Sequence, residues 1–137
     1  MHDEVQPRPA VHPSKAARLR AVLILIVLEK IVQHFFVSVA FYFDVQGLQS
    51  TVVVDPQVLM ITGLMVAVLF GLALWGLILN HPRAIDLIIA LALFDIFGEF
   101  VAQGRVDVAI TVSFIVAIAL LAVGLMFRRQ IRRSRPS

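Results

Sequence analysis

The stretch from Leu19 to Phe43 has the sequence LRAVLILIVLEKIVQHFFVSVAFYF and is apolar at most positions. A helix needs roughly 20 mostly apolar residues to cross a hydrocarbon core of about 30 Å. Because this stretch reaches that length, we predict a transmembrane helix there. Three further stretches have the same character, at 57–79, 84–102 and 106–127. The sequence therefore predicts an all-α fold, an integral membrane four-helix bundle.

The composition agrees with a multi-pass membrane protein. Of the 137 residues, 60% are hydrophobic and 15% are charged, whereas soluble domains average about 45–50% and about 25%. The chain has no cysteine, which excludes disulfides, iron–sulfur clusters, thiolate zinc sites and cysteine nucleophiles. Apart from the connections between spans, only the two ends of the chain lie outside the predicted membrane domain. We expect a disordered cytoplasmic tail at 1–18 and a basic cytoplasmic tail at 128–137.

The connections between the predicted spans are mostly short. Asp55 and Pro56 are suited to the cap and the first turn of the second helix. Only four residues, Asn80 to Arg83, separate the second and third stretches, which predicts a tight antiparallel hairpin. Gln103 to Arg105 form another short turn. The longer connection, 44–55, contains a β-branched run too short to stand alone as a strand, and we expect a loop at the membrane surface.

Basic residues are concentrated on one side of this four-span arrangement. Ten of the twelve lie beside the first span, in the second connection or after the fourth span: Arg8, Lys15, Arg18, Arg20, Arg83, Arg128, Arg129, Arg132, Arg133 and Arg135. Because cytoplasmic segments carry the excess of Lys and Arg, both termini are predicted to be cytoplasmic (N-in/C-in). Arg outnumbers Lys, and Ala, Val and Leu are abundant, as a GC-rich bacterial genome would encode. We therefore expect a bacterial cytoplasmic (inner) membrane.

The C-terminal arginines have a second expected use besides setting the topology. Arginines beside a membrane span attract anionic lipid headgroups, which we expect as partners together with the bilayer itself. The high isoelectric point alone does not indicate nucleic-acid binding, because no recognition element accompanies the basic residues. Nucleic acid is therefore not expected as a partner.

The first predicted span carries Glu29, Lys30, Gln33 and His34 near its middle, and the third carries Asp95 and Glu99. Ionisable residues at membrane depth are costly, so each one needs a partner or a function. At 1.5 Å per residue, Lys30 and Asp95 lie roughly 16 Å from the cytoplasmic side, and His34 and Glu99 roughly 22 Å. We therefore predict that spans one and three are in contact, with Lys30 facing Asp95 and His34 facing Glu99. Glu29 is expected to close onto Lys30 or, when protonated, to hydrogen-bond to a neighbour.

Small residues recur at four-residue spacing on the other two predicted spans. They are Gly63, Ala67 and Gly71 on the second, and Ala109, Ser113 and Ala117 on the fourth. Such stripes allow helices to approach closely. We expect them to pack neighbouring helices within one bundle.

Two uses of the polar cluster remain open. In the structural interpretation its groups neutralise one another and fix which helix packs on which, as in a non-enzymatic structural or accessory component. In the alternative, carboxylates and histidine form a proton or cation relay, as in a small proton-coupled transporter acting as a homo-oligomer. The pair of Glu99 and His34 would then share one proton.

No catalytic or cofactor-binding motif is present, and we expect neither an enzyme nor a cofactor. Of the four histidines, only His34 lies within a predicted span. A bis-histidine haem needs two histidines at membrane depth and is therefore not expected. His34, Asp95 and Glu99 would suit a metal ion chemically, but no dense ligand spacing supports a metal site. Ser38 and Ser113 lack the flanking motifs of an intramembrane protease, and no phosphate loop, nucleophile elbow or dinucleotide fingerprint occurs.

The four-span plan is similar to that of the small multidrug transporters, which carry one membrane-embedded glutamate in the first span. Glu29 matches that residue. The similarity ends there, because Lys30 beside it would oppose a cationic substrate and the third span lacks the Trp/Tyr pattern of that family. One matching residue does not assign the chain to the family.

Overall fold

The computed structural model of the chain describes residues 14–103 and 112–133. These residues form, in order, α1 (Lys15–Tyr42), the 3-10 helix η1 (Val45–Thr51), α2 (Pro56–Ile78), α3 (Ala84–Gln103) and α4 (Val112–Arg133). The predicted all-helical fold is confirmed for the described part of the chain. The predicted tail residues 1–13 and 134–137, and the predicted start of the fourth span at 106–111, lie outside the described residues.

Three of the described helices, α1, α2 and α4, are long and apolar enough to cross a membrane. Helix α3 has a comparable length of 20 residues but carries three carboxylates, Asp86, Asp95 and Glu99. Because these carboxylates are spread along α3, it has no long stretch as free of charge as those of the other three helices, although the sequence predicted a span there. The structure thus supports a membrane protein through three helices.

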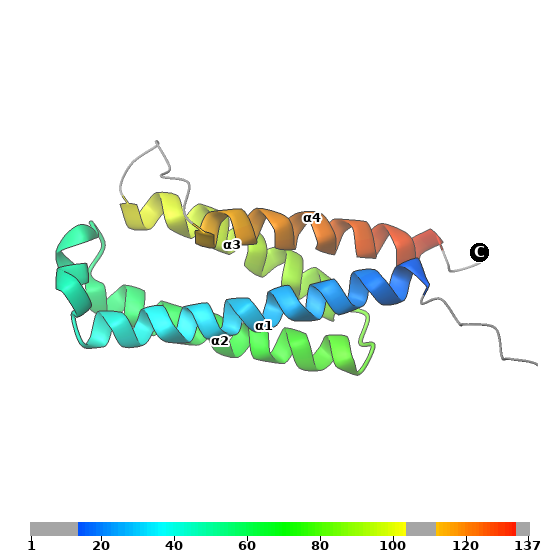
Figure 1. Ribbon diagram of the computed structural model, residues 1–137, viewed down its shortest axis with the longest axis horizontal. Helices are drawn as coiled ribbons and strands as arrows, with labels where there is room; N and C mark the ends of the chain where they lie inside the picture. Colours follow the sequence, from blue (N-terminus) through cyan, green and yellow to red (C-terminus); the bar gives the residue numbers. More distant parts are fainter. Residues whose placement is uncertain (1–13, 104–111, 134–137) are drawn as a thin grey trace, which may run out of the picture.

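The four long helices alternate in direction along the long axis of the molecule (Figure 1). Helix α1 packs against α2 and α4, and α3 also packs against α2 and α4. Helices α1 and α3 are therefore diagonal in the bundle. The start of α1, the α2–α3 turn and the end of α4 lie together at one end, here called the basic end (Figure 1). The basic end carries Lys15, Arg18, Arg20, Arg83, Arg128, Arg129, Arg132 and Arg133.

Two helices extend beyond the predicted spans at the basic end. The Ser14 hydroxyl accepts a hydrogen bond from Ala17 N at 3.2 Å, and α1 begins at Lys15. Residues 15–18, predicted as part of a disordered tail, are helical because this cap lies upstream of the apolar run. Helix α4 likewise continues through 128–133 of the predicted basic tail. Arginine is a good helix former, and its charge suits the C-terminal end of a helix.

The connections agree with the sequence prediction at α2 and α3 and differ at 44–55. The Asp55 carboxylate caps α2 by accepting a hydrogen bond of 2.8 Å from a first-turn amide, as predicted. Asn80 adopts the left-handed conformation, with φ 56°, in the tight α2–α3 turn. The 44–55 connection, predicted as an irregular loop, contains η1. The Asp44 carboxylate accepts a hydrogen bond from Gln49 N at 2.9 Å, which stabilises this helical turn locally.

The apolar core lies mostly in the half of the bundle toward the basic end. Its buried members come from all four long helices: Leu23, Val27, Val66, Phe70, Ala73, Leu77, Ala84, Ile85, Ile88, Ile89, Leu91, Ala92, Leu120 and Phe127. Most of these residues lie in the half of their helix that is nearer the basic end. The opposite half of the interior is more polar, and it contains the candidate site.

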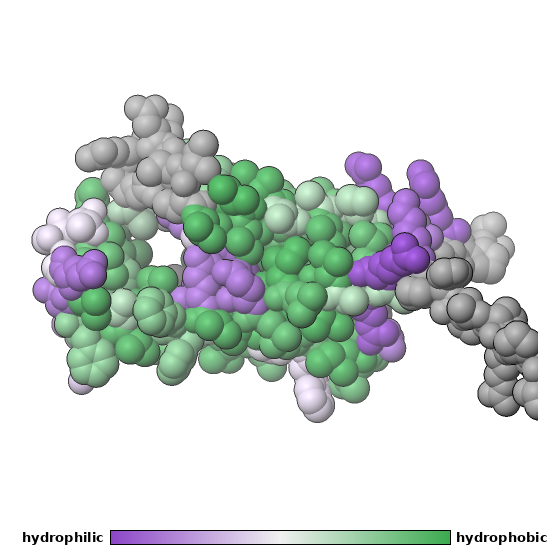
Figure 2. Space-filling model, in the orientation of Figure 1, coloured by the Kyte–Doolittle hydropathy of each residue, from purple (hydrophilic) through white to green (hydrophobic). Residues whose placement is uncertain are grey.

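The outer surface is also largely apolar. The face shown in Figure 2 is hydrophobic over most of its length between the two ends. Large apolar side chains are exposed on every long helix, among them Leu25, Ile61, Phe97 and Ile115. Soluble monomers rarely expose contiguous apolar patches beyond a few hundred Å². This surface is suited to contact with hydrocarbon.

Candidate functional site

A buried ion cluster lies halfway along the bundle. Lys30 Nζ lies 3.0 Å from Asp95 Oδ2, and His34 Nε2 lies 3.0 Å from Asp95 Oδ1. The Lys30 side chain has no exposed surface, and that of Asp95 is 4% exposed. Because α1 supplies Lys30 and His34 while α3 supplies Asp95, the cluster joins the two diagonal helices through the interior of the bundle.

The Lys30 ammonium group also binds α4. Its Nζ donates to Gln33 Oε1 at 3.0 Å, to Ser113 O at 3.1 Å and to Ser113 Oγ at 3.3 Å. The contact with Asp95 Oδ2 is an ion pair without hydrogen-bond geometry, and this buried oxygen accepts no hydrogen bond from the described chain. A lysine ammonium has three donors and no acceptor, so its hydrogen-bonding capacity is used. The buried charge is therefore both paired and hydrogen-bonded, as burial in a low dielectric requires.

His34 connects the cluster to α2. Its ring stacks on Phe70 with the centroids 5.8 Å apart and an angle of 25° between the planes. The His34 side chain is 20% exposed, so it is the most accessible of the three ionisable groups. The contact between Nε2 and the Asp95 carboxylate is a hydrogen bond when Nε2 carries the proton. All four long helices thus contribute a side chain to the site.

The structure corrects one predicted pairing of the sequence analysis. Lys30 does face Asp95, but His34 also binds Asp95 rather than Glu99. Helix α3 diverges from α1 toward the opposite end of the bundle (Figure 1). Asp95 therefore serves as the common partner of the two α1 side chains.

Glu29 is not part of the buried cluster. It is exposed on the outside of α1, and no hydrogen bond or ion pair links it to the described residues. Successive helix residues point about 100° apart, so Glu29 faces outward when Lys30 faces inward. Figure 2 shows a hydrophilic patch halfway along the apolar face, over the middle of α1, where Glu29 is exposed and Gln33 is half-buried. The expected closure of Glu29 onto Lys30 is therefore wrong.

The small-residue stripe on α2 is used at one end only. A Cβ added at Gly63 would lie 2.5 Å from Ser38 Oγ of α1, so Gly63 allows the two helices to approach closely. Ser38 reinforces that contact by donating a hydrogen bond to Met60 O at 3.2 Å. Ala67 is buried beside it. A Cβ at Gly71 would meet no atom within 4 Å, so that residue makes no close helix contact.

The second predicted stripe contains a polar contact that sequence reasoning missed. Ser113 was expected to pack helices, whereas it accepts hydrogen bonds from Lys30. The available signal was the hydroxyl group of Ser113 at the start of a long apolar run, 114–127. Ala117 is buried, and Ala109 lies outside the described residues.

The cluster offers limited chemistry. Within residues 14–103 and 112–133, no three His, Asp or Glu side chains are grouped as a metal site would require. The contact between His34 and Asp95 can exchange a proton, and the ammonium group of Lys30 fixes the carboxylate. Comparison with family models, curated proteins and solved structures gave no match. Functional conclusions therefore rest on the geometry of the site.

Proposed function

We propose that this chain is a four-span membrane protein that acts as a non-enzymatic structural or accessory component. The ion cluster holds the helices of its bundle in fixed positions relative to one another. The observation that carries the proposal is the full engagement of Lys30, which has no exposed surface and contacts three partner side chains. An ionisable group at membrane depth is costly unless it is paired. Buried and mutually paired groups are better suited to holding helices together than to binding and releasing a solute.

Helix α3 is proposed as the fourth span. At about 1.5 Å per residue its 20 residues extend about 30 Å, the thickness of a hydrocarbon core. Partners of opposite charge stabilise Asp86 and Asp95. Asp86 lies in the first turn, where it pairs with Arg128 at 3.0 Å, and Asp95 pairs within the ion cluster. These pairings support a membrane position for a helix with three acids.

Both termini are proposed to be cytoplasmic, in a bacterial inner membrane. Of the nine Lys and Arg residues in the described chain, eight lie at the basic end and one, Lys30, lies inside. This asymmetry favours a cytoplasmic basic end. The chain has no cysteine of its own, so single cysteines report topology directly. We expect Gln49→Cys to react with an impermeant thiol reagent from outside intact cells and Ser134→Cys to be protected; the reverse pattern would contradict the orientation.

A small proton-coupled transporter acting as a homo-oligomer is the second candidate, and one observation favours it. His34 keeps 20% of its side chain exposed and shares Asp95 with Lys30. Imidazole is the side chain best suited to gain and lose a proton near neutral pH. A partly accessible imidazole on a buried carboxylate would serve as the first step of a proton path.

One pair of measurements separates the two candidates. Proton flux is measured in proteoliposomes, and thermal stability in detergent, for the wild type and for Asp95→Asn. The structural proposal expects no wild-type flux above that of empty vesicles and a clear loss of stability in the variant. Wild-type flux that Asp95→Asn abolishes, with stability unchanged, would replace the structural proposal by the transport one.

A further inference from the structure

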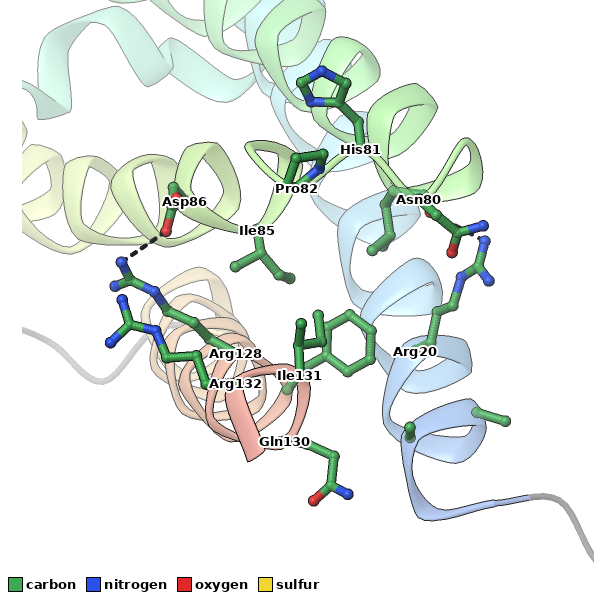
Figure 3. Close-up of a pocket in the computed structure, with 14 residues that line it drawn as sticks. Arg20, Asn80, His81, Pro82, Ile85, Asp86, Arg128, Gln130, Ile131 and Arg132 are labelled. Carbon is green, nitrogen blue, oxygen red and sulfur yellow. Dashed lines mark hydrogen bonds and ion pairs between the residues drawn. The ribbon is translucent and has the colours of Figure 1, made fainter. Parts of the chain in front are cut away.

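A pocket at the basic end is separate from the ion cluster. It has a volume of about 680 Å³ and lies between the start of α1, the α2–α3 turn and the last turns of α4. Figure 3 shows Arg20 on one side and Arg128 and Arg132 beside Asp86 on the other. Ile85 and Ile131 lie between these two walls (Figure 3). With Leu77 and Phe127, these isoleucines give the pocket an apolar floor.

The α4 wall of the pocket is cationic. The pocket as a whole is lined by three arginines, of which Arg128 and Arg132 belong to α4, and by one carboxylate, Asp86. Its formal net charge is therefore +2 with His81 neutral. Arg128 pairs with Asp86 at 3.0 Å, but their side chains are 39% and 54% exposed, so water competes with this pair. No ion pair holds Arg132 within the described chain. The α4 wall therefore presents guanidinium groups that can bind an anionic partner.

The α1 wall has a fixed donor without an acceptor. Arg20 Nη2 donates to Leu77 O at 3.1 Å and to Ile78 O at 2.9 Å. These carbonyls belong to the last turn of α2, where the amide four residues on no longer continues the helix. The guanidinium group is thereby held in place, while Arg20 Nε is buried and has no partner within the described chain. The α1 wall of the pocket therefore carries a guanidinium group in a fixed position.

We propose that this pocket binds an anionic phospholipid. The phosphate would lie against Arg128 and Arg132, and the glycerol and upper acyl region over the apolar floor, opposite Arg20. Guanidinium groups bind phosphate through paired, charge-assisted hydrogen bonds. The inference rests on the proposed membrane orientation, which places the basic end among cytoplasmic headgroups, where basic pockets between helices bind anionic lipids. A soluble phosphate ester shares the anionic chemistry, but it would leave the apolar floor uncovered.

Helix α4 supplies a matched control for this proposal. Arg129 and Arg133 are adjacent to the pocket arginines in sequence and carry the same charge, but they do not line the pocket. General attraction to an anionic surface depends on all four arginines alike. Binding in the pocket depends on Arg128 and Arg132.

The test uses the full-length protein, delipidated in a neutral detergent and titrated with phosphatidylglycerol or with phosphatidylcholine of the same acyl chains. Bound lipid is counted by native mass spectrometry. We expect one phosphatidylglycerol to bind at least about tenfold more tightly than phosphatidylcholine. The double variant Arg128→Gln/Arg132→Gln should lose this preference, and Arg129→Gln/Arg133→Gln should keep it. Equal loss in both double variants would show general charge attraction and overturn the pocket.

Two further measurements test the phosphate contact and the identity of the ligand. Arg132→Gln alone breaks no ion pair in the described chain, so it should stay folded and still weaken phosphatidylglycerol binding several-fold; unchanged binding would overturn the assignment of the phosphate to this wall. Inorganic phosphate at lipid-equivalent concentration should not displace phosphatidylglycerol, and displacement would overturn the lipid as the ligand.

Failure of the membrane proposal itself has a different signature. The wild type is reconstituted into vesicles of phosphatidylcholine alone, floated and washed at high salt. Retention together with absent phosphatidylglycerol preference would overturn only the lipid pocket. Loss from the vesicles would overturn the membrane placement on which the pocket depends.

Discussion

The basic-end half and the opposite half of the bundle are held together by different interactions. Toward the basic end, apolar side chains such as Leu23, Leu77 and Ile88 fill the interior. Toward the other end, Lys30 and Asp95 meet across the diagonal. In a bilayer, apolar side chains gain little by leaving lipid, so packing depends on close fit, whereas polar contacts join specific partners. The apolar half therefore supplies contact area, and the ion cluster determines how far the helices are shifted along one another.

The largest expected effect is the loss of one member of the buried pair. Lys30→Met or Asp95→Leu leaves an uncompensated charge in the interior and should destabilise the bundle by about 3–5 kcal/mol. The double variant should lose less than either single variant, because replacing both charges removes the uncompensated one. Stability is measured by unfolding in mixed micelles with increasing SDS.

Glu29→Gln provides the control for that experiment, since this exposed carboxylate has no partner in the described chain. It should change stability little. A double variant whose loss equals the sum of the two single losses would contradict the pairing, and with it the contrast between the two halves.

A smaller effect is expected from packing in the apolar half. Leu23 is fully buried, whereas Leu25 on the same helix is 66% exposed. Leu23→Ala should lower the free energy of unfolding by about 2–4 kcal/mol through the cavity that it leaves, and Leu25→Ala by about 0.5 kcal/mol. The same SDS titration measures both, and equal losses would show that Leu23 is not in a packed core.

The two glycines of the α2 stripe should respond in opposite directions. Gly63→Ala brings a methyl group against Ser38 and should cost about 1–3 kcal/mol. Gly71→Ala meets no neighbouring atom and should raise stability by about 0.5–1 kcal/mol, because alanine is the better helix former. Thermal unfolding in detergent distinguishes them, and destabilisation by both would mean that a partner covers Gly71.

The smallest effect is expected at the exposed ion pair of the basic end. Asp86→Asn removes the contact with Arg128 and should cost at most about 1 kcal/mol, because both side chains are partly exposed. The loss should shrink as sodium chloride is raised, since salt screens exposed charges. A loss as large as that of Asp95→Leu would remove the distinction between buried and exposed pairs.

The sequence predicted the helices and the contact of Lys30 with Asp95 because hydropathy and helix rise determine position along the bundle axis. It did not predict that His34 shares Asp95, because rise alone does not determine the direction in which α3 diverges. It also expected Glu29 to turn inward, although its neighbour Lys30 occupies the interior. Both errors concern tilt and rotation, which depend on packing between helices.

The pocket at the basic end was missed for a related reason. Several of its lining residues, including Ala16, Ala17 and Arg132, lie outside the predicted spans. Apolar runs define the membrane core but not the polar turns that extend a helix beyond it. The Ser14 cap and the arginine-rich end of α4 provide those turns, and the pocket forms between them.

The partners of Lys30 also have a consequence for how the protein is made. Ser113 follows Lys30 by 83 positions, and Asp95 precedes Ser113 in the chain. During synthesis, α1 therefore emerges from the ribosome long before its counter-charge and its hydrogen-bond acceptors exist. In the proposed membrane placement, the first helix remains energetically incomplete until the third and fourth helices are translated. A nascent chain that ends before α3 therefore carries a lysine at membrane depth without its counter-charge, which is costly.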